Sequence, residues 1–327
     1  MLTHARPLEL ARPLSRLSRP PALRPPQRAL LYVPGSSHKF LTKVLSGTGL
    51  APEAQPDVVT LDLEDSVRTE LKTEARKLVT SALDSAPASL KSRKFVRINS
   101  GRTGFDDLEA ILSASSLDGL VLPKVHTAAD LVAADAFVTA HGGERHKDLK
   151  FVASIESPLG LLNAREIAAC SKRVGALLFA AEDYCASSRL VRTPSRRELL
   201  FARSSVVAVA HAHGLDAVDL VCVRYGGEGA QRELEDECRE GREMGFTGKQ
   251  AIHPAQVETI QRAFSPSPAE IERAQRILAQ YDAAARDAGR GAYGLVGEDG
   301  SVEMMDAPML LQAKSVLEQA RAAGVDV

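Results

Sequence analysis

Residues 151–183 read FVASIESPLGLLNAREIAACSKRVGALLFAAED, and this stretch shows the repeating unit from which the fold is predicted. Two apolar, β-prone runs, 151–155 and 176–180, flank a helix-like segment rich in Ala, Leu and Glu. The first run leads into Glu156 and the second into Asp183. A carboxylate that closes a buried strand is costly unless something binds it. The stretch therefore predicts a strand–helix–strand unit that carries two acids on one edge.

The same alternation continues on both sides of this unit. Helix-like segments rich in Ala, Leu, Glu, Lys and Arg separate the apolar runs. The eight predicted strands are Ala29–Val33, Val58–Leu63, Phe95–Ile98, Gly119–Leu122, Phe151–Ile155, Ala176–Ala180, Ala217–Val221 and Gly248–Ile252. Eight such strands predict an α/β fold of the (β/α)₈ TIM-barrel type. A doubly wound open sheet is the alternative, but no GxGxxG motif follows the first strand.

The chain after the eighth strand predicts a C-terminal extension of helices and loops. Ser267 and Glu270 form a capping box around Pro268, which predicts a helix that runs to about Arg286. A last helix is expected after the Met-Asp-Ala-Pro sequence at 305–308. Such an extension can serve as a lid or as an exchange segment between subunits. The predicted parts are a basic arm (1–28), the barrel (29–264) and the extension (265–327).

The N-terminal arm is strongly basic. It has six arginines and a single acid, Glu9. Its leucines and serines make it resemble a mitochondrial transit peptide, and it lacks the apolar centre of a secretory signal. Its prolines interrupt any long helix, so a disordered basic arm is the alternative interpretation. We expect the mitochondrial matrix, with the cytoplasm as the alternative.

The composition excludes several classes of partner. The formal net charge is −1, which gives no general attraction to nucleic acid or to an anionic membrane. No apolar run is long enough to span a bilayer. The four cysteines show no CxxC spacing, and we expect them to be unpaired thiols of a reducing compartment.

Polar side chains follow most of the predicted strands, where a barrel of this kind carries its chemistry. Glu156 and Asp183 offer hard oxygen ligands with few competing His or Cys, which suits Mg²⁺. Lys124, after the fourth strand, is a rival candidate as a Schiff-base lysine. We expect it instead to pair with Glu156 or Asp183, because two carboxylates would keep its amine protonated.

A set of segments gives the chain a family resemblance. They are LLYVPGSSHKF (30–40), VVTLDLEDSV (58–67), FVRINS (95–100), GLVLPKV (119–125), IESPLGLLN (155–163), FAAEDY (179–184), EMGFTGKQAIHPAQ (243–256) and MMDAPMLLQA (304–313). With them the chain resembles the HpcH/HpaI aldolase and citrate lyase β-subunit family. Within it, the chain is most similar to the mitochondrial citrate lyase β-like proteins, which are citramalyl-CoA lyases. The resemblance covers nearly the whole chain outside the basic arm.

The resemblance implies roles for individual residues. Glu156 and Asp183 match the Mg²⁺ ligands, and Arg97 matches the arginine that binds the acyl group near the metal. Asp306 matches a catalytic carboxylate that a neighbouring subunit delivers, which implies a homo-oligomer, a trimer or a hexamer. The positions that match contacts to coenzyme A are Tyr32, Lys39, Lys43, Ile252 and His253. Two departures affect the acyl pocket: Ala180-Ala181 before the Glu-Asp pair, and the loop 226–229.

The resemblance implies a Mg²⁺-dependent retro-Claisen lyase that converts citramalyl-CoA to acetyl-CoA and pyruvate. Malyl-CoA or β-methylmalyl-CoA cleavage, malate synthase-like condensation and malyl-CoA thioester hydrolysis remain alternatives. One methyl group is worth only about 1–3 kcal/mol in a pocket, so the sequence does not separate these substrates. A non-catalytic or complex-bound subunit of the citrate lyase β type is an alternative of a different class.

Overall fold

A computed structural model describes residues 25–288, 293–296 and 302–327. The predicted basic arm lies outside the described residues, except for positions 25–28. The chain divides into two compact units, and the division falls between Ile260 and Gln261. This point lies inside helix α10 (Val257–Ala263), whereas the sequence suggests a boundary after residue 264. Each unit is described by itself below.

The first unit is a closed barrel of eight parallel strands in the order β1 to β8. The strands are β1 (Ala29–Pro34), β2 (Val58–Asp62), β3 (Arg93–Arg97), β4 (Gly119–Leu122), β5 (Lys150–Ile155), β6 (Val174–Phe179), β7 (Asp216–Asp219) and β8 (Gly248–Ala251). All eight coincide with predicted strands to within a few residues. Because β1 also pairs with β8, the sheet has no free edge, and the open-sheet alternative is excluded.

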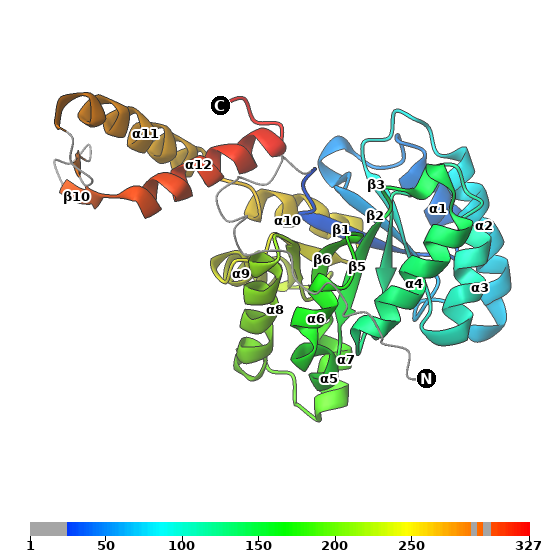
Figure 1. The fold of residues 1–327 in the computed structure, drawn as a ribbon. Helices are drawn as coiled ribbons and strands as arrows, with labels where there is room; N and C mark the ends of the chain where they lie inside the picture. Colours follow the sequence, from blue (N-terminus) through cyan, green and yellow to red (C-terminus); the bar gives the residue numbers. More distant parts are fainter. Residues whose placement is uncertain (1–24, 289–292, 297–301) are drawn as a thin grey trace, which may run out of the picture. The chain divides into compact units, whose positions relative to one another are not determined.

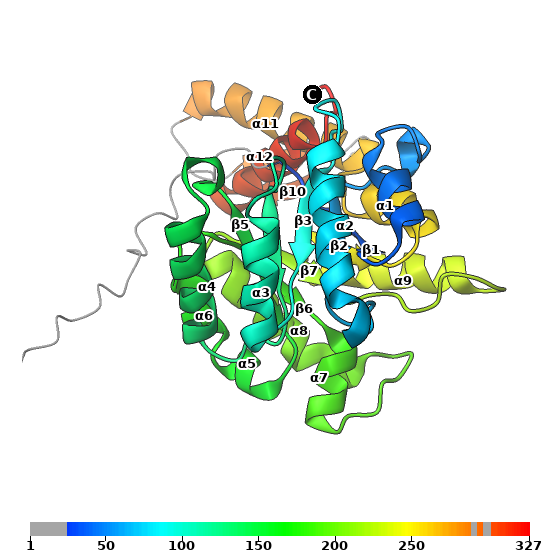
Figure 2. The same ribbon diagram turned by 90° about the vertical axis from the view of Figure 1, so that its right-hand side faces the viewer.

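Helices cover the outside of the barrel, with α2, α3 and α4 on one side of the strands and α8 and α9 on the other (Figure 1; Figure 2). The α-helices of this unit are α1 (His38–Leu45), α2 (Lys72–Ser85), α3 (Gly101–Ile111), α4 (Ala128–His141), α5 (Pro158–Leu162), α6 (Ala164–Ala169), α7 (Ala181–Ser188), α8 (Leu200–Ala212), α9 (Ala230–Glu243) and α10. Short 3₁₀ turns are η2 (Pro52–Ala54), η3 (Thr69–Leu71), η4 (Glu144–His146), η5 (Arg197–Leu199) and η6 (Pro254–Gln256).

Alternate side chains on the strands fill the barrel interior. A buried cluster takes side chains from seven of the strands: Leu30, Val58, Phe95, Val121, Val152, Ala176, Leu178 and Val218. Side chains on a strand alternate between two faces, so every second residue points the same way. Two steps along from the cluster residues Leu30, Phe95 and Val58 stand Tyr32, Arg97 and Thr60. The alternation that packs the core thus also aims polar groups into the mouth of the barrel.

The opposite faces of β7 and β8 carry a buried ionic network. Arg203 of α8 and Asp219 at the end of β7 are both fully buried, and two hydrogen bonds of 3.1 and 2.8 Å join them. Lys249 of β8 contacts Asp219 at 4.0 Å and Glu237 of α9 at 2.9 Å. The network fastens α8 and α9 to the last two strands.

The second unit consists of α11 (Pro268–Ala288), a hairpin of β9 (Tyr293–Val296) and β10 (Val302–Met305), and α12 (Ala307–Ala322). The predicted capping box is present, because Glu270 Oε2 accepts a hydrogen bond from the backbone N–H of Ser267 at 2.7 Å. The sequence does not predict the hairpin. The two helices share an apolar core of Ile271, Ala274, Ile277, Leu310, Ala313, Leu317 and Ala320.

Two further expectations concern the chain as a whole. All four cysteines are free thiols, as predicted. Among the helices of residues 25–288 and 302–327, none has both the length and the apolar character needed to cross a bilayer.

We predict that Arg203→Met lowers the free energy of unfolding by about 3–5 kcal/mol, because it leaves the Asp219 carboxylate buried without its main partner. Urea denaturation measures the change. Arg232→Met, at an exposed position of α9, is the matched control and should change stability by no more than about 0.5 kcal/mol. Equal losses in the two variants would contradict the role assigned to the buried pair.

Candidate active site

Arg97, at the end of β3, is the most firmly held group in the mouth of the barrel. Its Nε and Nη2 donate to the two carboxylate oxygens of Asp62 at 2.6 and 2.7 Å. Its Nη1 lies 3.1 Å from Glu64, and its guanidinium sits 5.0 Å from the ring centre of Tyr32. Such a two-pronged pair fixes the orientation of a guanidinium as well as its position. The guanidinium of Arg97 is therefore held in a defined position and orientation on the rim.

The Arg97–Asp62 pair fixes both charges. Burial alone would lower the pKa of Arg97, but the hydrogen bonds and charge of Asp62 outweigh it, and the pKa is raised. Burial alone would raise the pKa of Asp62, but the bonds from Arg97 hold that pKa below its usual value. Burial raises the pKa of Tyr32, so its phenol stays protonated and can donate a hydrogen bond.

Lys124 follows β4 and turns toward the loop after β2. Its amine binds the carboxylate of Glu64 and lies 3.5 Å from that of Asp65. The sequence-based pairing with Glu156 or Asp183 is therefore wrong. β2 and β4 flank β3, so side chains at their ends meet across Arg97.

The environment of Lys124 has two consequences. Burial would lower the pKa of its amine, but the hydrogen bond to Glu64 outweighs this and raises the pKa. A protonated amine is no nucleophile, which disfavours the Schiff-base alternative. The backbone of Lys124 is left-handed, with φ of 52°, a conformation that side-chain-bearing residues adopt at a cost of about 1 kcal/mol or more.

Glu156 and Asp183 come from neighbouring βα units of the barrel, because β5 pairs with β6. Glu156 follows β5 directly and is only 5% exposed. Asp183 is not at the strand end itself: β6 stops at Phe179, Ala180 caps α7, and Asp183 lies in the first turn of that helix. The carboxylate is half-buried there. The pair thus combines a strand end with a helix start.

The carboxylate of Glu156 is only partly compensated, by hydrogen bonds from the Ser154 side chain and the Lys124 backbone. Among the described residues, its Oε2 has no hydrogen-bond partner. Burial, assisted by the charge of Asp183, raises the pKa of Glu156 to about 7. An orphaned buried oxygen beside a second carboxylate is what a hard cation with oxygen ligands requires. These residues therefore fit Mg²⁺, and the role of Glu156 and Asp183 as its ligands stays a prediction.

The residues expected to contact coenzyme A lie on two adjoining sectors of the rim. Lys39 and Lys43 are exposed and one turn apart on α1, which follows β1. Ile252 and His253 directly follow β8, the barrel partner of β1. Their backbone N–H groups both donate to Gln256. These predicted positions thus belong to adjoining βα units of the barrel, and Tyr32 lies next to Arg97.

Asp306 belongs to the second unit and has a structural task there. It is the N-cap of α12, where its Oδ1 accepts a hydrogen bond from the backbone N–H of Met309 at 3.1 Å. It is half-buried, and Pro308 sits in the first turn. A helix N-cap is a sufficient structural reason for an Asp at this position. Its catalytic role stays a prediction.

A set of polar residues behind the loop of Glu64 holds that loop in place, and the sequence pattern does not reveal it. Lys72 of α2 donates to the carbonyls of Leu63 and Glu64, each at 3.0 Å, and to Asn99 Oδ1. Asn99 in turn donates to Asp107 at 2.7 Å. The loop that carries Glu64 is therefore fixed from behind. In the sequence Lys72 looks like any solvated helix lysine, and no local signal separates it from Lys77.

A second group of possible metal ligands, Cys222, Glu233 and Glu237, lies outside the barrel mouth. Glu237 already binds Lys249 at 2.9 Å and has Arg192 and Arg196 within 3.5 and 3.7 Å. Three positive charges compensate this carboxylate, so a further cation there would be repelled. This cluster is an ion-pair network.

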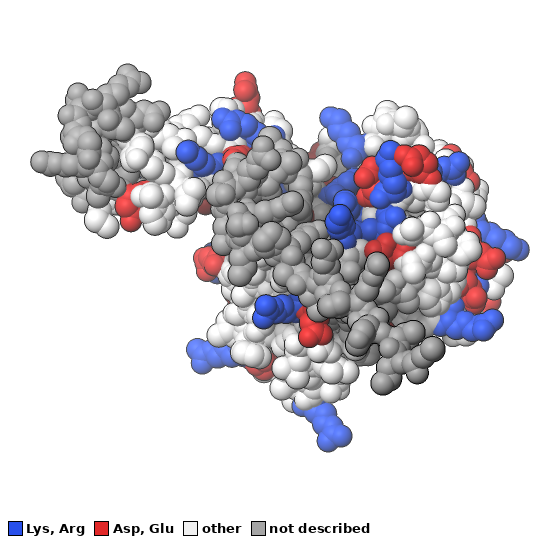
Figure 3. Space-filling model, in the orientation of Figure 1, with Lys and Arg blue, Asp and Glu red and all other residues white. Residues whose placement is uncertain are grey.

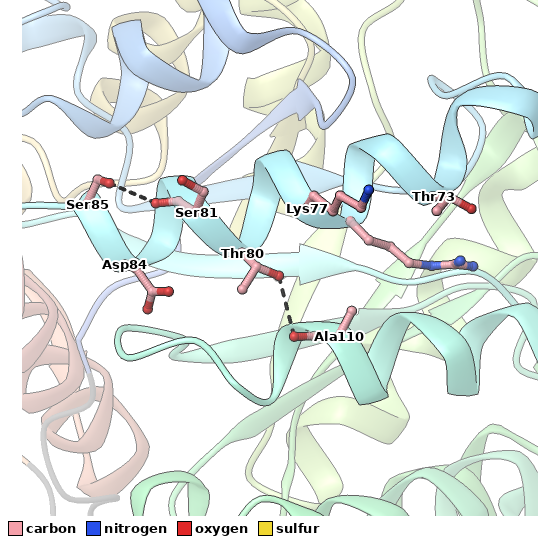
Figure 4. A pocket seen from close by; sticks show the side chains of 8 residues that line it. Thr73, Lys77, Thr80, Ser81, Asp84, Ser85 and Ala110 are labelled. Atoms are coloured by element: carbon pink, nitrogen blue, oxygen red, sulfur yellow. Dashed lines mark hydrogen bonds between the residues drawn. The ribbon is translucent and has the colours of Figure 1, made fainter.

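A groove on the outer surface of the barrel lies apart from the barrel mouth. This groove, of about 610 Å³, runs along the outer face of α2, where Thr80 Oγ1 donates to the carbonyl of Ala110 (Figure 4). None of its lining residues belongs to the barrel mouth.

Basic and acidic side chains are interspersed over the face in Figure 3, consistent with the net charge of −1.

Comparison with known proteins identifies relatives over most of the chain. Residues 28–254 match the family model for HpcH/HpaI aldolase/citrate lyase, and residues 199–325 match that for C–C bond lyases of the TIM-barrel fold. The mitochondrial citramalyl-CoA lyase of Homo sapiens is 34% identical, over 89% of this chain and 85% of its own. The (3S)-malyl-CoA thioesterase of Cereibacter sphaeroides (strain ATCC 17023) is 37% identical, over 85% of this chain and 89% of its own.

A solved structure shares the fold. The protein CitE from Mycobacterium tuberculosis, in complex with magnesium, acetoacetate and coenzyme A, is 28% identical with a TM-score of 0.67. The match covers 91% of this chain and 98% of that one.

We predict that Mg²⁺ raises the melting temperature of the protein and that Glu156→Gln removes this effect. Binding to the folded state alone adds about 2.7 kcal/mol at a hundredfold excess over Kd, and the neutral amide is a poorer ligand for a hard cation. Thermal unfolding with and without Mg²⁺ measures the shift. Glu166→Gln, at an exposed position of α6, should retain it. An unchanged shift in Glu156→Gln would rule out this carboxylate as a ligand.

Proposed function

The chain belongs to the HpcH/HpaI aldolase/citrate lyase family, and on this basis we propose that it is a Mg²⁺-dependent carbon–carbon lyase acting on a hydroxyacyl-CoA. The favoured substrate is citramalyl-CoA, which is cleaved to acetyl-CoA and pyruvate. The observation that carries the proposal is the unpartnered Oε2 of the buried Glu156 beside Asp183, in the same barrel mouth as the guanidinium of Arg97.

The reaction consists of one bond cleavage and two proton transfers. The bond between the carbinol carbon and the thioester α-carbon breaks, the hydroxyl loses its proton, and the α-carbon gains one. Glu156 and Asp183 would hold Mg²⁺, and the bound ion would supply Lewis acidity to the oxygens of the substrate. Arg97, held by Asp62, places a permanent positive charge where the thioester oxygen becomes negative. Since its orientation is fixed beforehand, little reorganisation is needed during the reaction.

Asp306 is the proposed proton carrier, acting on the hydroxyl or on the α-carbon of acetyl-CoA. It reaches the site from a neighbouring subunit, so the active protein is a homo-oligomer, a trimer or a hexamer. Support for this role comes from the resemblance of the segment 304–313 to the family, because the N-cap bond of Asp306 has a structural explanation of its own. The proposed parts of the chain are the arm (1–28), the catalytic barrel (29–264) and the extension (265–327).

The proposed compartment is the mitochondrial matrix. Support comes from the arginine-rich composition of the arm and from the human relative, whose name places it in mitochondria. The cytoplasm is the alternative. The proposed partner is the acyl-CoA substrate, contacted at Tyr32, Lys39, Lys43, Ile252 and His253, with no nucleic acid and no membrane.

Hydrolysis of malyl-CoA is the second candidate function, because the thioesterase relative is 37% identical. Cleavage of malyl-CoA or β-methylmalyl-CoA and the reverse condensation use the same groups. A complex-bound subunit would be inactive alone. Gel filtration combined with an assay on free acyl-CoA separates it from a self-sufficient homo-oligomer.

We predict that the purified protein releases pyruvate and acetyl-CoA from citramalyl-CoA, and that EDTA abolishes and Mg²⁺ restores this activity. A product assay on citramalyl-, malyl- and β-methylmalyl-CoA measures the preference. Release of free CoA with no keto acid would favour the thioesterase.

Borohydride is the control for the rival chemistry in the same assay. A protonated Lys124 forms no imine, so borohydride added with substrate should leave activity unchanged. Trapping of substrate on Lys124 would overturn the metal-dependent mechanism.

We further predict that Asp306→Ala and Glu156→Ala chains, each inactive alone, regain partial activity when mixed. Mixed oligomers contain some sites with both an intact metal pair and an intact Asp306 from another subunit. Mass spectrometry verifies the mixed oligomers, and the same product assay measures recovery. No recovery in verified mixed oligomers would show that Asp306 does not act across the interface.

A further inference from the structure

Two aromatic side chains stack on the rim of the barrel in an exposed position. Tyr225 lies in the segment after β7, and His253 follows β8. Their ring centres are 5.0 Å apart and their planes differ by 13°. Tyr225 is 57% exposed, and its apolar neighbours Val223 and Ile252 are 51% and 41% exposed. Exposed apolar side chains that gather beside a catalytic mouth mark a binding surface more often than chance exposure does.

The buried side chain of Gln256 fixes the two segments that carry these rings. Its Oε1 accepts from the backbone N–H groups of Ile252 and His253 at 2.9 and 3.3 Å. Its Nε2 donates to the carbonyl of Cys222 at 2.9 Å. One amide therefore ties the segment after β8 to the segment after β7, and the stacked pair is held in place before any ligand arrives.

The ring of His253 is itself oriented. The backbone N–H of Ala255 donates to its Nδ1 at 3.2 Å, which assigns the ring proton to Nε2. The imidazole lies flat against Tyr225. In the loop after Tyr225, a Cβ at Gly226 or Gly227 would meet no described heavy atom within 4 Å beyond the adjoining chain residues. This part of the loop is therefore loosely packed.

The chemistry of this surface selects an aromatic base. Coenzyme A contains one aromatic group, its adenine, and anionic phosphates beside it. The lysines on α1, Lys39 and Lys43, occupy the neighbouring sector, since β1 pairs with β8. Stacking on aromatic side chains needs no particular hydrogen-bond pattern, because every base has a π face.

We propose that Tyr225 and His253 form a stacking platform for the adenine of the CoA thioester, with Gln256 as the residue that positions them. This inference rests on the proposed function and adds Tyr225 and Gln256 to its substrate contacts. It places the recognition of the nucleotide on the β7–β8 side of the rim, away from the carbon atoms that react.

Calorimetric titration of the full chain with CoA and with 4′-phosphopantetheine, which lacks the nucleotide, tests the platform. Tyr225→Ala should weaken CoA binding about tenfold or more, the range found for loss of one stacked base, and leave 4′-phosphopantetheine binding unchanged. Tyr225→Phe keeps the ring and should bind CoA as the unaltered chain does. Phe201→Ala, at an exposed position of α8, is the matched control.

The outcomes separate the platform from the proposed function. If the unaltered chain binds CoA and Tyr225→Ala binds it equally well, the platform is wrong and the lyase proposal stands. If Tyr225→Ala weakens both ligands equally, the residue acts on the fold of the loop, and the platform is again wrong. If the unaltered chain binds no CoA, both proposals fall. Melting temperatures of the variants show whether each is folded.

Discussion

The bidentate pair between Arg97 and Asp62 is the interaction on which the rest of the site depends. It joins the ends of β2 and β3 and covers the apolar cluster that fills the barrel. Around it the charges are ordered: Glu64 lies between Arg97 and Lys124, and Lys72 fixes the loop of Glu64 from behind. Each group is satisfied by its neighbours, so the rim holds a fixed pattern of charge with little freedom to relax.

Glu156 differs from these paired groups, and the difference indicates its function. Arg97 pairs with Asp62 and Glu64, and Lys124 pairs with Glu64, whereas one oxygen of Glu156 has no hydrogen-bond partner among the described residues. A buried charge without compensation is unfavourable, and its pKa rises accordingly. Glu156 and Asp183 therefore have the character that a hard cation with oxygen ligands requires.

The sequence predicted most of the fold and part of the site, for identifiable reasons. All eight strands could be found because apolar runs of four to six residues recur between helix-like segments. The partner of Lys124 could not, because it depends on which strand ends face each other across β3 rather than on spacing along the chain. Asp183 was placed at a strand end, since a strand end and the first helical turn look alike over four residues. Lys72 and Tyr225 carry no local signal, and the family segment that ends at Gln256 does not reveal its bond to Cys222, because these contacts join segments that lie apart in the chain.

The left-handed backbone at Lys124 has a consequence for how this chain can change over time. Glycine or asparagine would fit that conformation with less strain, so the local backbone favours losing the lysine. Only the carboxylates of Glu64 and Asp65 favour keeping it. At position 124, selection for stability alone would favour replacing the lysine, whereas selection for the charged rim would favour keeping it. A lineage that no longer needed the rim would be free to drift there toward a more stable and less useful protein.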